Sequence, residues 1–238
     1  MKPRLRSASL SDIGRLRFEN QDRCLYDPEL RIFGVADGVG GMPGGAEAAE
    51  TAEEAVLAAL RANGTDGKPD LREAVRQAQA AVIQTGRAVS PIFGVATTLT
   101  FGCVHGGQLF IAHVGDSRCY VRSARKLQRL TEDHTVENEA RLRGEPLFAS
   151  PRERNAITRC LGQLPMPGPD IIERNLAPGE RYLFCTDGIT RVMSDAELGA
   201  LLGGPGEPSD VLESLIAHAL QRGGPDNASG VLLFIDEV

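Results

Sequence analysis

The sequence predicts an α+β fold in which helices and strands form separate layers. The chain has 238 residues, of which 42% are hydrophobic, and its Gly/Pro clusters are too short to be linkers, so we expect one domain. Two successive helical patterns, at 46–62 and 69–89, separate the first predicted strand from the next one. Strand-like runs at 95–104 and 108–114 then form a hairpin. This order favours layers over a repeated strand–helix–strand unit.

The first half of the chain is predicted to hold a strand, a loop and two helices before the hairpin. Residues 31–36 are an apolar run typical of a buried strand. Residues 38–45 are rich in glycine, which lets the backbone come close to a ligand. The helix at 46–62 places alanine, valine and leucine at helical spacing, and the helix at 69–89 opens with a Pro-Asp pair, a typical start signal.

The second half is predicted to return to the sheets after a polar excursion. The hairpin turns at His105-Gly106-Gly107. Residues 133–165 are polar and weakly patterned, which indicates an excursion from the core with a short helix at about 135–143. The spacing from Ser194 to Glu197 is typical of a helix start. The other predicted elements are strands at 118–122, 127–130, 181–186 and 230–236, and an amphipathic helix at 209–221.

Charge, hydropathy and cysteine content exclude several classes of protein. The net charge is −6 with both signs interspersed, which argues against non-specific nucleic-acid binding. The basic start of the chain is not followed by an apolar stretch, and no run of 18 apolar residues exists, so we expect neither a signal peptide nor a membrane span. The five cysteines show no C-x-x-C spacing and indicate reduced thiols in a cytoplasmic protein. Cys185 is close to Asp187, but its strand position and the lack of a nearby histidine disfavour a nucleophile.

Four aspartates stand at the ends of strand-like runs: Asp37, Asp116, Asp187 and Asp226. A single Asp-Gly pair is usually a turn, as we expect for Asp66 in a polar stretch. Four strand-end carboxylates in one chain favour a metal site over four separate turns, because several of them can converge at the edge of the core. Such a group supplies the hard oxygen ligands that Mg²⁺ or Mn²⁺ prefers.

Seven short segments carry a resemblance to a known family when they are taken in chain order. They are residues 17–22 (Arg, then Asn-Gln-Asp), 35–41 (Asp-Gly-x-Gly-Gly), 96–99 (Ala-Thr-Thr-Leu), 113–118 (Gly-Asp-Ser-Arg), 131–135 (Asp-His), 185–188 (Thr-Asp-Gly) and 224–227 (Gly-Pro-Asp-Asn). In this order they resemble the motifs of the PPM-type, or protein phosphatase 2C, family of metal-dependent protein serine/threonine phosphatases, in its compact bacterial form. The resemblance covers nearly the whole chain.

The resemblance implies a single domain over residues 1–238, with about 133–165 as a flap. It implies a four-layer α-β-β-α sandwich in which two face-to-face antiparallel sheets are flanked by pairs of helices. The cofactors would be two tightly bound Mn²⁺ or Mg²⁺ ions and a weaker third. By this resemblance Asp37 bridges two ions, the carbonyl of Gly38 joins it at one of them, and Asp187 and Asp226 complete the other. Asp116 would hold the third ion together with Asp187. Asp22 would act through metal-bound water, and Arg17 would bind the phosphate.

Elementary chemistry agrees with these implied roles. A phosphoserine carries nearly two negative charges and repels hydroxide, whereas two nearby cations neutralise that charge and acidify a bound water. The guanidinium of Arg17 presents a planar fork of donors that matches two phosphate oxygens. The other interpretation of Arg17 is a surface residue that pairs with Glu19 or Asp22.

The chain departs from the family pattern at several positions. Val39 stands where some members have a histidine thought to protonate the leaving group, so metal-bound water or His134 are the remaining candidates. His134 is better interpreted as a structural tie between a strand end and the flap. Gln21 replaces an acid and can still hydrogen-bond a metal-bound water. The flap matches poorly, so substrate choice is not implied.

From these observations we expect a monomeric cytoplasmic enzyme that dephosphorylates phosphoserine and phosphothreonine in proteins and opposes a bacterial serine/threonine kinase. Two alternatives stay open. One is a pseudo-phosphatase that uses the same fold as a phosphoprotein-binding module. The other is a metal phosphatase that acts on a small phosphoester.

Overall fold

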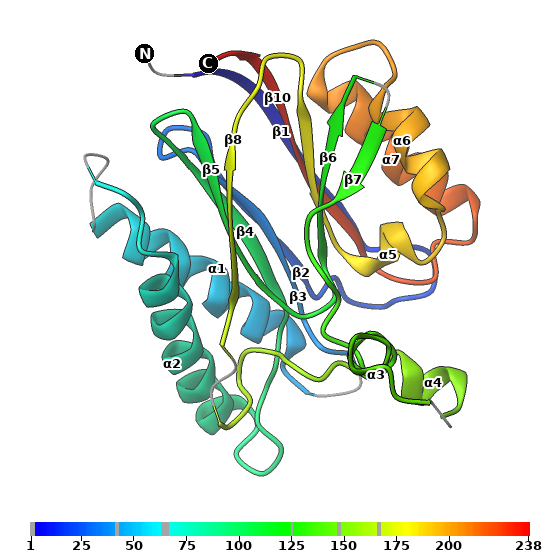
Figure 1. Cartoon of the computed structure of the whole chain (residues 1–238). Coiled ribbons are helices and arrows are strands. Elements are labelled where there is room, and N and C mark those ends of the chain that lie inside the picture. The colour runs from blue at the N-terminus through cyan, green and yellow to red at the C-terminus, as the bar shows by residue number, and fades with distance from the viewer. Residues whose placement is uncertain (1–2, 41–42, 63–66, 125, 147–148, 166–167) are drawn as a thin grey trace.

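Two five-stranded antiparallel sheets lie face to face at the centre of the protein (Figure 1). The computed structural model describes the chain apart from residues 1–2, 41–42, 63–66, 125, 147–148 and 166–167. The first sheet has the order β1 (Arg4–Asp12), β10 (Ala228–Glu237), β9 (Arg181–Cys185), β6 (Arg118–Ser123) and β7 (Lys126–Arg129). The second sheet has the order β2 (Asp22–Asp27), β3 (Ile32–Asp37), β4 (Leu99–His105), β5 (Gln108–Val114) and β8 (Asp170–Asn175).

The inner faces of the two sheets share one apolar layer. Phe33 and Ile111 of the second sheet pack in one cluster with Tyr182, Phe184 and Val231 of the first. Side chains alternate between the two faces of a strand, so every second residue of these buried strands points into this layer. The residues in between are also apolar, because helices cover the outer faces.

Helices α1 (Gly45–Ala62) and α2 (Leu71–Val89) cover the outer face of the second sheet (Figure 1). Small residues on α1, such as Ala48 and Ala52, are fully buried in the cluster that this helix forms with α2 and the sheet. Asp70 caps α2 by accepting a hydrogen bond from the backbone N–H of Glu73, which explains why the helix starts there.

Helices α6 (Asp195–Leu202) and α7 (Pro208–Gln221) cover the outer face of the first sheet. Leu212 and Leu215 of α7 and Leu198 of α6 belong there to one buried cluster with Leu232 of β10. The capping box predicted at Ser194 is confirmed, with Glu197 as its second member. Together the layers form the predicted α-β-β-α sandwich.

Three strands are absent from the prediction, namely β1, β2 and β8, and all three lie at sheet edges. The polar excursion contains two short helices, α3 (Val136–Arg143) and α4 (Pro151–Arg154). The predicted turn at Asp66 and residues 41–42 of the glycine-rich loop lie outside the described residues. In the part of the chain that the structure describes, no helix combines the length and the apolar character that crossing a membrane requires.

Candidate active site

Five aspartates gather at one end of the sandwich, where β3 ends and β2 and β10 begin. They are Asp22 at the start of β2, Asp37 at the end of β3, Asp116 in the turn between β5 and β6, Asp187 at the start of α5 (Asp187–Thr190), and Asp226 just before β10. Antiparallel pairing explains the convergence, because the end of one strand lies beside the start of the next. Asp22 and Asp37, for example, are directly paired across β2 and β3.

A pair of threonines holds the backbone of Asp37. The Thr98 hydroxyl accepts a hydrogen bond from the Asp37 N–H at 3.0 Å, and the Thr97 hydroxyl donates one to the Asp37 carbonyl at 2.9 Å. Thr98 is also hydrogen-bonded to the hydroxyl of Ser117 at 2.8 Å, next to Asp116 in the chain. The Thr-Thr segment therefore joins two of the aspartate loops, a role that the sequence did not reveal.

Two glycines allow the site loops to approach one another. A Cβ on Gly38 would collide with the carbonyl of Gly45, and a Cβ on Gly188 would collide with the carbonyl of Asn227. Each glycine directly follows a site aspartate in the chain. The Asp-Gly pairs are thus explained by close packing at the site as well as by turn chemistry.

Asp22 is almost fully buried, and its carboxylate accepts a hydrogen bond from the Thr186 hydroxyl at 2.9 Å. Burial raises the pKa of Asp22 to about 6, although hydrogen bonds from Ser229 and Thr186 oppose that shift. Thr186 precedes Asp187, so the bond connects β2 of the second sheet to the start of α5.

The clustered carboxylates favour cations. Burial, then the charge of Asp116, raises the pKa of Asp187 to about 8, against the opposing effect of Arg191. Burial and the charge of Asp22 raise the pKa of Asp37 well above its usual range. The neighbouring carboxylates thus add to burial in making Asp37 and Asp187 harder to ionise, so a cation bound among them is strongly favoured.

The structure brings Arg17 next to Asp226, and Arg17 pairs with neither Glu19 nor Asp22. Its guanidinium donates to Asp226 Oδ2 at 2.7 Å, and its side chain is 40% exposed. The Asn227 side chain fixes the Arg17 loop, since its amide donates to the carbonyls of Ile13 and Glu19. This tie explains the asparagine of the Asp-Asn motif.

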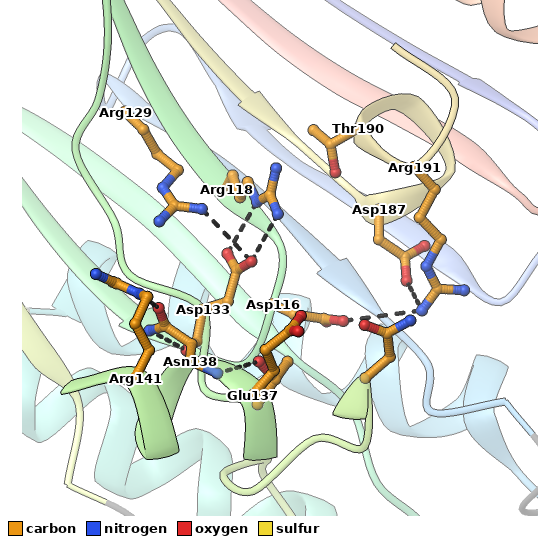
Figure 2. Close-up of a pocket in the computed structure, with 12 residues that line it drawn as sticks. Asp116, Arg118, Arg129, Asp133, Glu137, Asn138, Arg141, Asp187, Thr190 and Arg191 are labelled. Atoms are coloured by element: carbon orange, nitrogen blue, oxygen red, sulfur yellow. Dashed lines mark hydrogen bonds and ion pairs between the residues drawn. The ribbon is translucent and has the colours of Figure 1, made fainter. Parts of the chain in front are cut away.

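A second guanidinium, from Arg191, lies among the aspartates and was missed by the sequence reasoning. It forms an ion pair with Asp187 and lies 3.9 Å from Asp116 Oδ2 (Figure 2). It also lies 3.5 Å from Asp226 Oδ2. The available signal was its position four residues after Asp187, which puts both side chains on one face of a helical turn.

A polar pocket of about 350 Å³ opens beside the aspartates, between α5 and α3 of the excursion (Figure 2). Its charged lining, apart from the site residues, consists of Arg118, Arg129, Asp133, Glu137 and Arg141. Arg118 is held by Asp133 through two hydrogen bonds of 2.8 and 2.6 Å. The predicted flap therefore contributes one wall of a space next to the site.

His134 and Gln21, which bear on the departures from the family pattern, have defined hydrogen-bond partners. His134 accepts a hydrogen bond from the Gly115 N–H through Nδ1 and contacts Asp170 of β8 through Nε2 at 3.1 Å, which is the tie expected of a structural histidine. The side-chain amide of Gln21 donates to Glu19. Burial raises the pKa of Cys185 to about 12, which disfavours a thiolate nucleophile.

The donor set suits a hard divalent cation. Asp116 Oδ1 is buried and has no hydrogen-bond partner among the described residues, which is the state expected of an oxygen meant for a cation. As the side chains stand, no three His, Cys, Asp or Glu groups in that part of the chain are arranged to hold one ion. In this arrangement the carboxylates of Asp226 and Asp187 are paired with Arg17 and Arg191.

Comparisons with known proteins place this fold in a family. The chain belongs to the protein phosphatase 2C family, whose profile matches residues 18–205. The serine/threonine protein phosphatase PstP of Mycobacterium tuberculosis is 33% identical over 238 residues, covering 96% of this chain and 44% of PstP. The serine/threonine phosphatase stp of Listeria monocytogenes is 27% identical and covers 94% of this chain and 93% of that protein.

A solved structure agrees with these relatives. The PstP catalytic domain in complex with two manganese ions has a TM-score of 0.81 and 32% identity, and the match covers 98% of this chain and 99% of that one. The predicted family and the predicted α+β fold are thereby confirmed. This chain spans less than half the length of full PstP, so it corresponds to the catalytic part of that relative.

Proposed function

We propose that the protein hydrolyses phosphoserine and phosphothreonine in other proteins at a centre of two divalent ions, Mn²⁺ or Mg²⁺. The observation that carries the proposal is the convergence of five aspartates from separate segments at one end of the sandwich, with Arg17 beside them. The relatives named serine/threonine phosphatases support the reaction, and the two manganese ions of the PstP catalytic domain support the cofactor.

The ion ligands would be Asp37 with the carbonyl of Gly38, together with Asp187 and Asp226. Divalent ions held there would neutralise the phosphate charge and activate water, which is the chemistry that phosphoester hydrolysis requires. The chain keeps the Asp37 ligand in place through Thr97 and Thr98. Rigid placement of this kind means that little rearrangement is needed during the reaction.

Arg17 and Asp22 would act on substrate and water. The exposed guanidinium of Arg17 can turn from Asp226 to a phosphate group once cations neutralise that carboxylate. Asp22 is paired with Asp37 across β2 and β3, and its buried carboxylate can orient water through hydrogen bonds. Neither role needs a histidine at position 39, where the chain has valine.

The substrate would be a phosphorylated protein rather than a small phosphoester. The pocket beside the aspartates is lined by charged groups of both signs, which suits the polar side chains around a phosphorylated residue. We further propose a monomeric cytoplasmic enzyme that opposes a serine/threonine kinase. The pseudo-phosphatase alternative is not favoured, since every aspartate implied by the family resemblance is present.

A substrate screen tests this choice. Initial rates with Mn²⁺ should be measured on phosphothreonine and phosphoserine peptides, a phosphotyrosine peptide, and a panel of sugar phosphates and nucleotides. We expect kcat/KM on the phosphothreonine and phosphoserine peptides to exceed that on every small phosphoester. A higher kcat/KM on one metabolite would favour the small-molecule alternative, and no turnover of any compound would favour the pseudo-phosphatase.

A further inference from the structure

The guanidinium of Arg191 occupies the side of the aspartate cluster where the family resemblance implies a weaker third ion. That ion would depend on Asp116 and Asp187, and Arg191 is in contact with both carboxylates. It also lies 3.5 Å from Asp226, so it faces three of the five aspartates at once. No other cation among the described residues lies within 4 Å of Asp116.

Local structure fixes this placement. Asp187 begins α5, and the backbone N–H of Arg191 donates to the Asp187 carbonyl at 2.8 Å, which closes one helical turn. Side chains in a helix lean toward its amino-terminal end, so the Arg191 side chain is directed back over Asp187. The arrangement therefore follows from the four-residue spacing along the helical turn.

Neighbouring arginines do not take this role. Arg118 is held by the two oxygens of Asp133 on the other side of the pocket. Arg17 pairs with Asp226 on the exposed side of the site, where a substrate phosphate would enter. Arg191 alone among these three contacts Asp116 and Asp187.

The balance of charges at the site also favours two ions over three. The five aspartates carry five negative charges when they are ionised, and two divalent ions neutralise four of them. The guanidinium of Arg191, which stays charged at any physiological pH, neutralises the fifth once Arg17 has turned from Asp226 to a substrate phosphate. A third divalent ion at Asp116 would have to share these carboxylates with a fixed positive group, and like charges at such distances repel strongly.

We propose that Arg191 is a built-in cation that takes the place of the third metal ion in this chain. Its guanidinium neutralises Asp116 and Asp187 and keeps the centre at two ions. The inference rests on the proposed two-ion function. It implies that the centre is complete at a lower concentration of free divalent metal than a three-ion centre would need.

Calorimetric titration of metal-free protein with Mn²⁺ tests the proposal without using activity. Wild type should bind two ions. Arg191→Gln removes the charge with little loss of volume and should bind a third ion at least about tenfold more tightly than wild type binds any further ion. Arg191→Lys retains a positive charge and should resemble wild type. Adding Asp116→Asn to Arg191→Gln should abolish the third site.

Arg76→Gln is the matched control, because Arg76 pairs with Glu73 on the surface of α2, outside the site. Arg191→Ala serves as a second neutral variant, and melting curves verify that each variant is folded. If folded Arg191→Gln and Arg191→Ala bind ions as wild type does, the inference is wrong while the two-ion function stands. If wild type already binds three ions with similar affinity, the inference is also wrong. If wild type binds no Mn²⁺, both the proposed function and the inference fail.

Discussion

The hydroxyl of Thr98 accepts a hydrogen bond from the backbone N–H of Asp37 at 3.0 Å. Thr98 is fully buried, and the same hydroxyl is bonded to Ser117 beside Asp116. A threonine that touches no substrate thereby sets the position of the aspartate proposed to bridge two ions. Groups of this kind behind metal ligands commonly control how tightly the metal is bound.

Thr98→Val should therefore weaken both the fold and the metal centre. Valine has the same shape but leaves the Asp37 N–H without an acceptor, so the free energy of unfolding should fall by about 1–3 kcal/mol. The affinity for Mn²⁺ should fall roughly 10–100-fold, as measured by calorimetry on folded protein. Thr85→Val is the control, because it removes a hydroxyl pair with Thr51 between α1 and α2. Equal Mn²⁺ affinity in the two variants would show that Thr98 does not position Asp37.

Asp187→Asn should abolish most activity and leave the fold intact. The change removes one ligand charge, so kcat at saturating Mn²⁺ should drop below about a tenth of wild type. The melting temperature of the metal-free protein should stay within a few degrees, because the lost carboxylate repels Asp116. Asp236→Asn, which changes a carboxylate bound to Arg6 outside the site, should keep wild-type activity. Retention of wild-type kcat by Asp187→Asn would remove Asp187 from the proposed centre.

Arg17→Ala should change substrate binding more than metal binding. Loss of the guanidinium should raise KM for a phosphopeptide and weaken inhibition by inorganic phosphate, since both would use the same donors. Mn²⁺ affinity should not fall, because Arg17 competes with the ions for Asp226. Arg15→Ala is the matched control, as that side chain donates to the Leu220 carbonyl instead. Equal steady-state constants for wild type and Arg17→Ala would place Arg17 outside the phosphate site.

The fold shows which features a single sequence can predict. Buried strands such as β3 and β9 are continuous apolar runs, and both were predicted almost to the residue. The three missed strands, β1, β2 and β8, are edge strands with exposed or half-buried positions and many polar residues. β1 is identified only by its partner, because Leu10 pairs with Gly230 at the far end of the chain. Edge pairing depends on distant segments, which local periodicity does not reveal.

The site also contains features that the sequence predicts and features that it does not. Asp37, Asp187 and Asp226 were predicted from their motifs, and the structure brings them to one end of the sandwich. The ties made by Thr98 and Asn227 were not predicted, because they join loops that are far apart in sequence. Ordered motifs therefore locate the charged groups, whereas the hydrogen bonds that position them emerge only from the packing of the loops.

Stability should depend on pH through His113, which is fully buried. Burial, aided by the nearby His134, lowers the pKa of His113 to about 4 from an ordinary value of about 6.5. As the pH falls through this window, the unfolded chain takes up a proton before the folded one does, so the free energy of unfolding decreases. The decrease from His113 should reach about 3 kcal/mol between pH 6.5 and 4.

Urea titrations of metal-free wild type and His113→Gln across that range provide the measurement. Glutamine keeps hydrogen-bonding groups toward Thr100 and Glu132 but cannot be protonated. The curve of unfolding free energy against pH should therefore be shallower in the variant. Parallel curves would mean that His113 titrates normally and is not buried as the structure places it.

Turnover of a phosphothreonine peptide, followed as released phosphate, tests the proposed metal-dependent reaction most directly. Metal-free protein should be assayed with excess EDTA, with increasing Mn²⁺, and with Mn²⁺ added back after EDTA, beside Asp187→Asn as a control for contaminating phosphatases. We expect no turnover with EDTA, saturable turnover that returns with Mn²⁺, and almost none in the variant. Equal rates with EDTA and with Mn²⁺, or equal rates in wild type and Asp187→Asn, would contradict a metal-dependent phosphatase at this site.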